Sequence, residues 1–323
     1  MLVTVVGNYP KIPNLPRPAR LRNAYARLDR GDITPEEMAR VEDEVTQEVI
    51  KEQEAAGIEL VTDGQIRWMD EQTYLAGRMS GIELNGLIRF FDTNTYYREP
   101  VVQSHVSWRG PITVRDYEFA VANASRPVKP VLTGPYTLAR LSRNDHYPSL
   151  DQLAHYYAEA LNEEARALQA LNPPLIQFNE PAITRHPEDI TLADLIWSTL
   201  LEGLTVETAV YFYFGAPKDA CYTAINSGFT TVGVDATNPG VLDSLKSGPR
   251  PQKLAVGAVD SRTTRLESVD QIAAIVSEAE ALVASDNLYV NPNMGLEFLP
   301  CEQARAKLVR LVEGVNRARG TAA

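Results

Sequence analysis

The sequence predicts an α/β fold, a (β/α)8 TIM barrel, because short β-branched runs alternate with long amphipathic segments along the whole chain. The short runs are almost continuously apolar, which is typical of strands buried on both faces of a parallel sheet. Strand and helix alternating in this way favour a barrel, with a doubly wound open sheet as the alternative. The eight predicted strands cover residues 2–7, 58–64, 129–135, 174–181, 208–215, 230–236, 253–260 and 287–293.

The segments between these runs predict helices. Residues 34–56 begin with Thr34-Pro35-Glu36-Glu37, in which a capping side chain precedes a proline at the first helical position. Residues 149–171 keep apolar side chains at helical spacing. Further helices are predicted over residues 190–205, 216–227, 268–285 and 301–317, and residues 318–323 are expected to fray.

One stretch interrupts the alternation. Residues 85–118 alternate apolar and polar side chains around turn signals, which predicts a β-hairpin inserted between the second and third barrel strands. Long insertions after barrel strands often cover an active-site mouth. No linker or internal repeat is visible, so residues 1–323 are predicted to form a single domain.

Composition excludes several classes of function. The chain has 323 residues, 44% of them hydrophobic, and a net charge of −11 without a basic run, so neither nucleic acid nor an anionic membrane is an expected partner. No apolar run reaches the roughly 18 residues of a membrane span. Cys221 and Cys301 stand in no metal-ligand spacing. These features predict a cytoplasmic protein with a small-molecule ligand.

Polar side chains gather at the predicted strand ends, where barrel enzymes carry their chemistry. Asp63, Glu180, Asp235 and Asp260 are expected to converge on one mouth, with Arg262 beside them. The alternative is that such residues cap the following helices. That alternative explains Glu180 poorly, because a carboxylate before a proline at a buried strand end requires a partner or a ligand. No Ser/His/Asp order, cysteine nucleophile or phosphate-binding glycine loop is present.

Five motifs, taken in order, resemble the C-terminal catalytic barrel of cobalamin-independent methionine synthase and its single-barrel relatives. They are "ELVTDGQIR" (59–67), "GPITVRDYEFA" (110–120), "VKPVLTGPYT" (128–137), "IQFNEPAI" (176–183) and "YVNPNMGLEFLP" (289–300). The resemblance runs over nearly the whole chain. It implies methyl transfer to homocysteine sulfur from a methylated folate or, in some relatives, a corrinoid, with zinc holding the sulfur as thiolate.

The resemblance fails at the zinc site. The family's ligands are His-x-Cys at strand 5, Glu at strand 6 and Cys at strand 8, and the matching residues here are Tyr211, Tyr213, Asp235 and Met294. Neutral phenols and a thioether are poor ligands for zinc, which requires about four nitrogen, sulfur or carboxylate donors. No resident metal or other cofactor is therefore expected, although the family implies zinc.

The amino-acid pocket differs as well. The strand-2 Glu and strand-4 Asp that hold the homocysteine ammonium in the family match Gln65 and Asn179, and the strand-1 Ser matches Asn8. Each charged hydrogen bond removed costs a bound ammonium roughly 1.5–3 kcal/mol. These changes predict the same barrel with a less cationic ligand. The predicted substrate-binding residues are Asn8, Asp63, Gln65, Arg67, Asn179, Tyr211, Tyr213 and Met294.

Three functions are consistent with this pattern. In the first, a methyltransferase with an altered acceptor, Glu180, Asp235 or Asp260 acts as general base and Arg262 orients an anionic group. The second is a zinc-free lyase or another group transfer by the same carboxylates. The third is a non-catalytic ligand-binding paralogue. A corrinoid protein or a second copy of the chain is a possible macromolecular partner.

Overall fold

The computed structural model describes residues 1–11 and 19–320. By its internal contacts the chain divides into two compact units. The first unit comprises Met1–Arg67, Asp116–Val128 and Val256–Ala323, and the second comprises Trp68–Arg115 and Lys129–Ala255. Each unit is built of parallel strands and helices, so the predicted mixed α/β fold is confirmed. The closed eight-stranded barrel and the single domain stay predictions.

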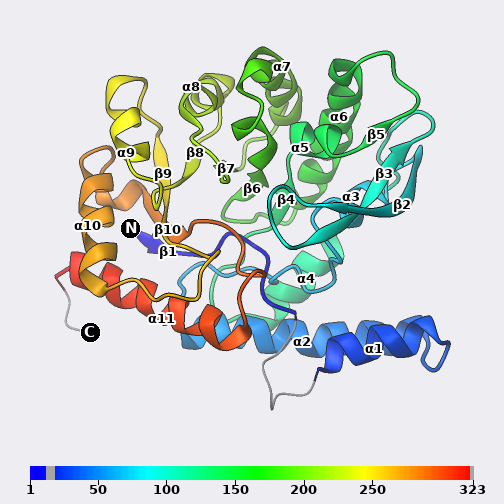
Figure 1. The fold of residues 1–323 in the computed structure, drawn as a ribbon, viewed down its shortest axis with the longest axis horizontal. Helices are drawn as coiled ribbons and strands as arrows, with labels where there is room; N and C mark the ends of the chain where they lie inside the picture. The colour runs from blue at the N-terminus through cyan, green and yellow to red at the C-terminus, as the bar shows by residue number, and fades with distance from the viewer. Residues whose placement is uncertain (12–18, 321–323) are drawn as a thin grey trace. The chain divides into compact units, whose positions relative to one another are not determined.

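In the first unit β1 (Leu2–Val3) pairs in parallel with β10 (Leu288–Pro292) (Figure 1). Asn293 N, just after β10, donates to Val259 O at the end of β9 (Lys253–Val259) over 2.9 Å. The predictions of strands at 2–7 and 58–64 were too long. After Val3 only a bridge from Thr4 to Leu60 continues the pairing.

The second predicted strand is reduced to isolated bridges, and at Thr62 a side chain takes the place of a neighbouring strand. The Gln53 amide donates to Thr62 O and accepts from Thr62 N, both over 3.0 Å. These are the backbone groups that a ladder would otherwise use. Val61 keeps a single parallel bridge to Val128.

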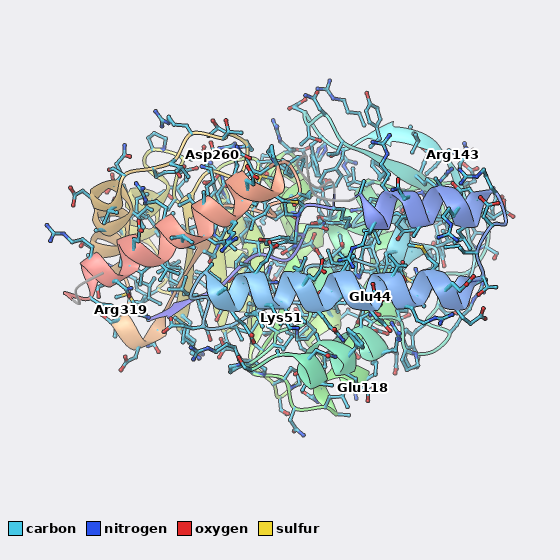
Figure 2. All side chains as sticks on the ribbon, turned by 90° about the horizontal axis from the view of Figure 1, so that it is seen from below. Glu44, Lys51, Glu118, Arg143, Asp260 and Arg319 are labelled. Atoms are coloured by element: carbon cyan, nitrogen blue, oxygen red, sulfur yellow. The ribbon has the colours of Figure 1, made fainter. Side chains whose placement is uncertain are left out.

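The helices of the first unit include three that the sequence predicts. Thr34 caps α2 (Pro35–Ala55) in a capping box with Glu37, and Ser268 caps α10 (Val269–Glu280) in the same way. The third, α11 (Cys301–Ala318), packs against α10. Figure 2 shows α1 (Arg20–Asp29), which the sequence analysis missed, running beside α2, with Glu44 and Lys51 of α2 labelled. The short η4 (Ser285–Asn287) precedes β10.

In the second unit β4 (Val131–Thr133), β6 (Ile176–Asn179), β7 (Thr208–Phe212) and β8 (Thr231–Asp235) are neighbours in this order and run parallel. All lie within predicted strands. The helices α6 (Leu150–Gln169), α7 (Ile190–Leu201) and α8 (Lys218–Ser227) pack against one another and cover these strands (Figure 1). Shorter helices complete the connections: α5 (Pro135–Arg140), α9 (Val241–Ser244), η1 (Pro181–Thr184), η2 (Pro187–Asp189) and η3 (Leu245–Ser247).

The second unit also contains an antiparallel pair, β2 (Ile82–Arg89) and β3 (Tyr96–Val102), with β5 (Arg143–Asn144) beside β3. The hairpin predicted over 85–118 was wrong at its C-terminal end. Residues 103–113 form no strand and α4 (Val114–Asn123) follows. The Glu164 carboxylate of α6 accepts hydrogen bonds from Ile112 N and Thr113 N, which fixes this connection without a strand partner.

The short helix α3 (Thr73–Ala76) lies between residue 68 and β2 and positions side chains discussed below. Within residues 1–11 and 19–320 no helix is both long and apolar enough to cross a membrane. The predicted fraying of residues 318–323 is wrong for Ala318, which belongs to α11, and residues 321–323 lie outside the described part of the chain.

Candidate functional site

The predicted site residues divide between the two units. Asn8, Asp63, Gln65, Arg67, Asp260, Arg262 and Met294 belong to the first unit, and Asn179, Glu180, Tyr211, Tyr213 and Asp235 belong to the second. Each set is described in turn. The convergence of all of them on one mouth stays a prediction.

In the first unit the ends of the first two predicted strands lie together. Tyr9 N donates to Gly64 O over 3.0 Å, and the Thr62 hydroxyl donates to Gly7 O over 3.2 Å. Gly64 has φ +68°, and a Cβ there would lie 2.6 Å from Val49. Only glycine fits such a turn. The turn places Asn8 beside the Asp63-Gly64-Gln65 segment.

Gln65 combines backbone strain with an unpaired side chain. Its φ is +50°, unusual for a residue with a side chain, and only 1% of its surface is exposed. Neither the amide oxygen nor the amide nitrogen has a hydrogen-bond partner among the described residues. Burying such a group unpaired costs about 1–3 kcal/mol. Strain and an unsatisfied polar group at one residue are typical of a binding site.

Asp63 is the titratable group of this turn. Its Oδ1 accepts from Gln65 N over 3.0 Å. Burial, with the nearby negative charge of Asp116, raises the pKa of Asp63 to about 6, against the opposing effects of the Gln65 hydrogen bond and the positive charges of Arg67 and Lys11. Asp63 can therefore exchange a proton close to neutral pH.

Arg67, which was predicted to bind substrate, forms ion pairs and a hydrogen bond within the first unit. Its guanidinium pairs with Asp43 and lies 3.4 Å from an Asp116 oxygen. It also donates to the Thr46 hydroxyl over 3.3 Å and lies over the Phe119 ring. These contacts fix α2 and α4 around the turn that carries Asp63 and Gln65.

The loop after β10 joins the same region. Leu296 N donates to Asn8 O over 2.8 Å, and a Cβ on Gly295 would lie 3.0 Å from Asn8 Cβ. The Asn8 amide oxygen accepts from Lys11 Nζ over 3.3 Å. Met294 is buried, and its backbone oxygen accepts from the Ser261 hydroxyl over 3.2 Å. The first unit thus brings Asn8, the Gln65 turn and the Met294 loop together.

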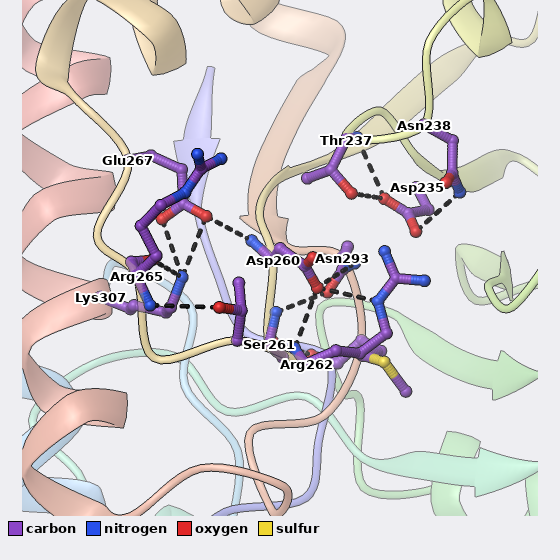
Figure 3. A network of polar contacts seen from close by, with 12 residues as sticks. Asp235, Thr237, Asn238, Asp260, Ser261, Arg262, Arg265, Glu267, Asn293 and Lys307 are labelled. Atoms are coloured by element: carbon purple, nitrogen blue, oxygen red, sulfur yellow. Dashed lines mark hydrogen bonds and ion pairs between the residues drawn. The ribbon is translucent and has the colours of Figure 1, made fainter. Parts of the chain in front are cut away.

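Asp260 and Arg262, both predicted to be catalytic, bond to each other (Figure 3). Asp260 Oδ1 accepts from Arg262 N and Nε, each over 2.9 Å, and from Asn293 Nδ2 over 3.2 Å. Burial alone would raise the pKa of Asp260, but the hydrogen bonds and charge of Arg262, with Asn293, lower it below its usual value. An ionised, well-bonded carboxylate is a weak base.

In the second unit the Glu180 carboxylate is fully buried and accepts four hydrogen bonds. They come from Tyr136 N (3.0 Å), Thr137 N (2.8 Å), the Thr137 hydroxyl (2.6 Å) and Trp197 Nε1 (3.1 Å). Burial raises its pKa, while these bonds lower it. Glu180 therefore fixes the first turn of α5, and a side chain at Gly134 would overlap it, with only 2.2 Å to Glu180 Cδ.

Asp235 is bonded within its own turn in the same way (Figure 3). Its oxygens accept from Thr237 N over 3.0 Å, from the Thr237 hydroxyl, and from Asn238 Nδ2 over 2.9 Å. None of Glu180, Asp235 and Asp260 caps the helix that follows it, as the alternative supposed, but each accepts its hydrogen bonds from its own chain. Asp63 differs, because the hydrogen bond that its Oδ1 accepts comes from one backbone N–H, that of Gln65.

The ends of β6 and β7 carry the remaining predicted residues. Asn179 accepts from Gln177 Nε2 over 2.8 Å through its amide oxygen. The Tyr211 ring packs under the buried Lys129, whose Nζ lies 5.1 Å from the ring centre. The Tyr213 hydroxyl donates to Glu71 Oε2 over 3.1 Å. Sequence reasoning missed Glu71, because it follows no strand and belongs to none of the five motifs.

The residues at the family's zinc positions do not fit zinc. Tyr213 has its hydroxyl bonded to Glu71, Asp235 has both oxygens bonded to its own turn, and Met294 offers a buried thioether. Among residues 1–11 and 19–320 no group of three or more His, Cys, Asp and Glu side chains is placed to hold a metal ion. Cys221 is buried in α8, where burial raises its thiol pKa.

Comparison with known proteins identifies the class to which this fold and these motifs belong. Residues 1–210 and 223–317 match the family described as cobalamin-independent synthase, catalytic domain. The methionine synthase of Sulfurisphaera tokodaii is 29% identical over 319 residues, covering 97% of this chain and 91% of the relative. That of Thermococcus kodakarensis is 28% identical over 321 residues, covering 97% and 92%.

Solved structures show the same fold. A B12-independent methionine synthase from Shewanella sp. W3-18-1, in complex with selenomethionine, superposes with a TM-score of 0.85 at 24% identity, over 99% of this chain and 98% of that one. A putative vitamin-B12-independent methionine synthase from Listeria monocytogenes gives 0.74 at 16% identity, over 97% and 98%. This chain belongs to the cobalamin-independent methionine synthase family, and the predicted resemblance is confirmed.

Proposed function

We propose that this protein is a methyltransferase of the cobalamin-independent methionine synthase type that works without zinc and methylates an acceptor other than homocysteine. The observation that carries the proposal is the contact between Tyr213 and Glu71. Where the family places a zinc-binding cysteine, this chain has a neutral phenol whose hydroxyl donates to a carboxylate. Such a pair holds no soft metal and no metal-bound thiolate.

The changes in the amino-acid pocket support an altered acceptor. Gln65 offers an amide where the family has a carboxylate, and that amide is buried without a partner among the described residues. Asn179 offers a second neutral amide whose oxygen is already bonded to Gln177. In each unit a neutral amide therefore stands where the family has a carboxylate for the homocysteine ammonium.

Asp63 is the group best suited to proton transfer in this proposal. Its pKa of about 6 allows it to accept the proton of the acceptor near neutral pH. The bond from the methyl carbon to the nitrogen of a methylated folate would break as its bond to the acceptor atom forms, and the proton taken up by Asp63 would pass to that nitrogen to give the demethylated folate. With a corrinoid donor, the bond broken would be the one to the corrinoid, which leaves with the electron pair. Asp260 and Arg262, which form one ion pair, would orient an anionic part of the donor through the exposed face of the guanidinium.

The test is a metal assay combined with thermal melting of the purified chain. We expect no stoichiometric zinc, no rise in Tm with homocysteine, and a rise with methyl-tetrahydrofolate. Stoichiometric zinc with a homocysteine-dependent rise in Tm would overturn the proposal, as would complementation of a methionine auxotroph. A rise with methyl-tetrahydrofolate but no consumption of its methyl group by any acceptor would favour the ligand-binding paralogue. The lyase alternative predicts no methyl-tetrahydrofolate binding.

A further inference from the structure

Glu267 joins the two ends of the loop that carries Arg262. This loop follows β9 and leads to α10, and it begins at Asp260. Asp260 N donates to Glu267 Oε1 over 2.9 Å, so a carboxylate at the end of the loop is bonded to the main chain at its start. Arg262 is bonded to Asp260 in turn, through its N and Nε, each over 2.9 Å. The position of Arg262 therefore depends on Glu267.

Lys307 of α11 holds Glu267 in place (Figure 3). Its Nζ donates to Glu267 Oε1 and Oε2, each over 2.9 Å, and to Arg265 O over 2.6 Å. None of the Lys307 side chain is exposed, and the Glu267 side chain is 12% exposed. Arg310, also of α11, donates from Nη1 to Glu267 O over 3.1 Å. The main chain and the side chain of Glu267 are thus both bonded to α11.

Stability alone explains the Glu267–Lys307 pair poorly. Burying two opposite charges carries a large desolvation cost, and replacing such a pair by apolar residues of similar size is often neutral for stability. An apolar pair could not, however, accept the hydrogen bond from Asp260 N. Figure 3 shows the resulting series of contacts, which leads from the buried Lys307 ammonium through Glu267 and Asp260 to the Arg262 guanidinium. The pair is better explained by the group that it orients.

We infer that Glu267 and Lys307 are positioning residues for the proposed methyl transfer, and that they act through Arg262 on a carboxylate of the methyl donor. The inference rests on the proposed function, in which Asp260 and Arg262 orient an anionic part of that donor. The Arg262 side chain is 39% exposed, and its donors point in fixed directions because the guanidinium is planar. A small shift of Asp260 would therefore misdirect them. A carboxylate matches this planar arrangement, and methyl-tetrahydrofolate carries carboxylates at one end.

The experiment measures the affinity of the full chain for methyl-tetrahydrofolate by calorimetric titration. Arg262→Gln should weaken binding about tenfold, as the loss of one charged hydrogen bond predicts. Glu267→Met combined with Lys307→Met removes the bond to Asp260 N, so it should weaken binding severalfold and leave the Tm close to that of wild type. Adding Arg262→Gln to this apolar pair should weaken binding no further than Arg262→Gln alone, because residues that act through Arg262 then have nothing to position.

The matched control is Arg317→Gln, which removes an exposed ion pair between α11 and Asp270 of α10 and should keep the wild-type affinity. Additive losses in the combined variant, or an unchanged affinity in the apolar pair, would overturn the inference. If the apolar pair does not fold, Glu267→Asp decides. It keeps a negative charge for Lys307 but shortens the side chain that reaches Asp260 N, so it should lower the affinity and again add nothing to Arg262→Gln.

Failure of the inference is distinguishable from failure of the proposed function. If the wild type binds methyl-tetrahydrofolate and Arg262→Gln or the apolar pair binds it equally well, the inference alone is wrong. A wild-type chain that does not bind methyl-tetrahydrofolate, or that holds zinc and responds to homocysteine, contradicts the proposed function and with it the inference.

Discussion

Glu180, at a strand end of the second unit, and Gln65, at a strand end of the first, are both buried but differ in the hydrogen bonds of their side chains. Glu180 is fully buried and accepts four hydrogen bonds from its own chain. Gln65 is almost as buried, and its amide has no partner among the described residues. Both belong to motifs shared with the family, so the motifs alone do not separate them.

The difference separates groups that build the fold from groups kept for a ligand. A polar side chain whose bonds are all satisfied by its own chain lowers the free energy of the folded state and has little left to offer a substrate. A buried side chain without partners raises that free energy, and a ligand can recover the cost. Substitutions at the two kinds of site should therefore have opposite effects on stability.

The largest effect is expected from Glu180→Ala. It leaves Tyr136 N, Thr137 N and Trp197 Nε1 without their buried acceptor, so the free energy of unfolding should fall by about 3–5 kcal/mol. Urea denaturation measures the loss, with the exposed Glu83→Ala as control, expected within about 0.5 kcal/mol of wild type. A loss below about 1 kcal/mol would mean that water replaces the carboxylate, and the structural role assigned to Glu180 would be wrong.

Asp63→Asn should have the next largest effect, with the opposite sign. The folded pKa of Asp63 is raised from 3.8 to about 6, so between these values the folded chain holds a proton that the unfolded chain has released. Stability from this group is complete below pH 3.8 and is lost as the pH rises through about 6. The substituted amide does not titrate, so at neutral pH the variant should be more stable than wild type by up to about 3 kcal/mol.

This prediction is checked by urea unfolding of both proteins at pH 4 and pH 7.5, with the exposed Asp286→Asn as control. The difference between Asp63→Asn and wild type should grow with pH, beyond any change that the control shows. A constant difference for Asp63→Asn would show that its pKa is not raised, and would remove it as the proton acceptor.

Much of the strand and helix pattern could be predicted from sequence, because burial on both faces and helical spacing leave local signals. The strands β4, β6, β7, β8, β9 and β10 lie within the predicted ranges, and the N-cap residue Thr34 marks the start of α2. The prediction of the second strand, residues 58–64, failed for a reason that no local sequence pattern shows. At Thr62 its backbone is bonded to the amide atoms of Gln53, a side chain nine positions earlier.

The sequence could predict which polar residues stand at the strand ends, and less well which hydrogen-bond partners they have. Strand-end position and family motifs selected Gln65, Asn179 and Tyr213. They equally selected Glu180, whose carboxylate accepts four hydrogen bonds from its own chain. Only the positions of the donors, from α5 and α7, distinguish the two cases. Glu71 could not have been found, because its contact with Tyr213 joins residues 142 positions apart.

The smallest effect on stability, and the most direct test of the comparison, is expected from Gln65→Ala. The substitution removes an amide that has no partner among the described residues, and it keeps the strained backbone. The free energy of unfolding should stay within about 1 kcal/mol of wild type or rise, since relief from the unpaired amide offsets the small cavity. Thr62→Ala is a useful contrast, because the Thr62 hydroxyl is bonded to Gly7 O and its loss should destabilise the same turn.

Gln65→Ala should weaken ligand binding, although it should leave the stability of the fold unchanged or higher. If the Gln65 amide is kept for a ligand, Gln65→Ala should weaken the binding of methyl-tetrahydrofolate in calorimetric titration by about fivefold to tenfold, the value of one neutral hydrogen bond to a buried group. A variant that loses more than about 2 kcal/mol of stability and keeps its affinity for methyl-tetrahydrofolate would place Gln65 with Glu180 among the groups that build the fold. The distinction between the two strand ends would then rest on Asp63 alone.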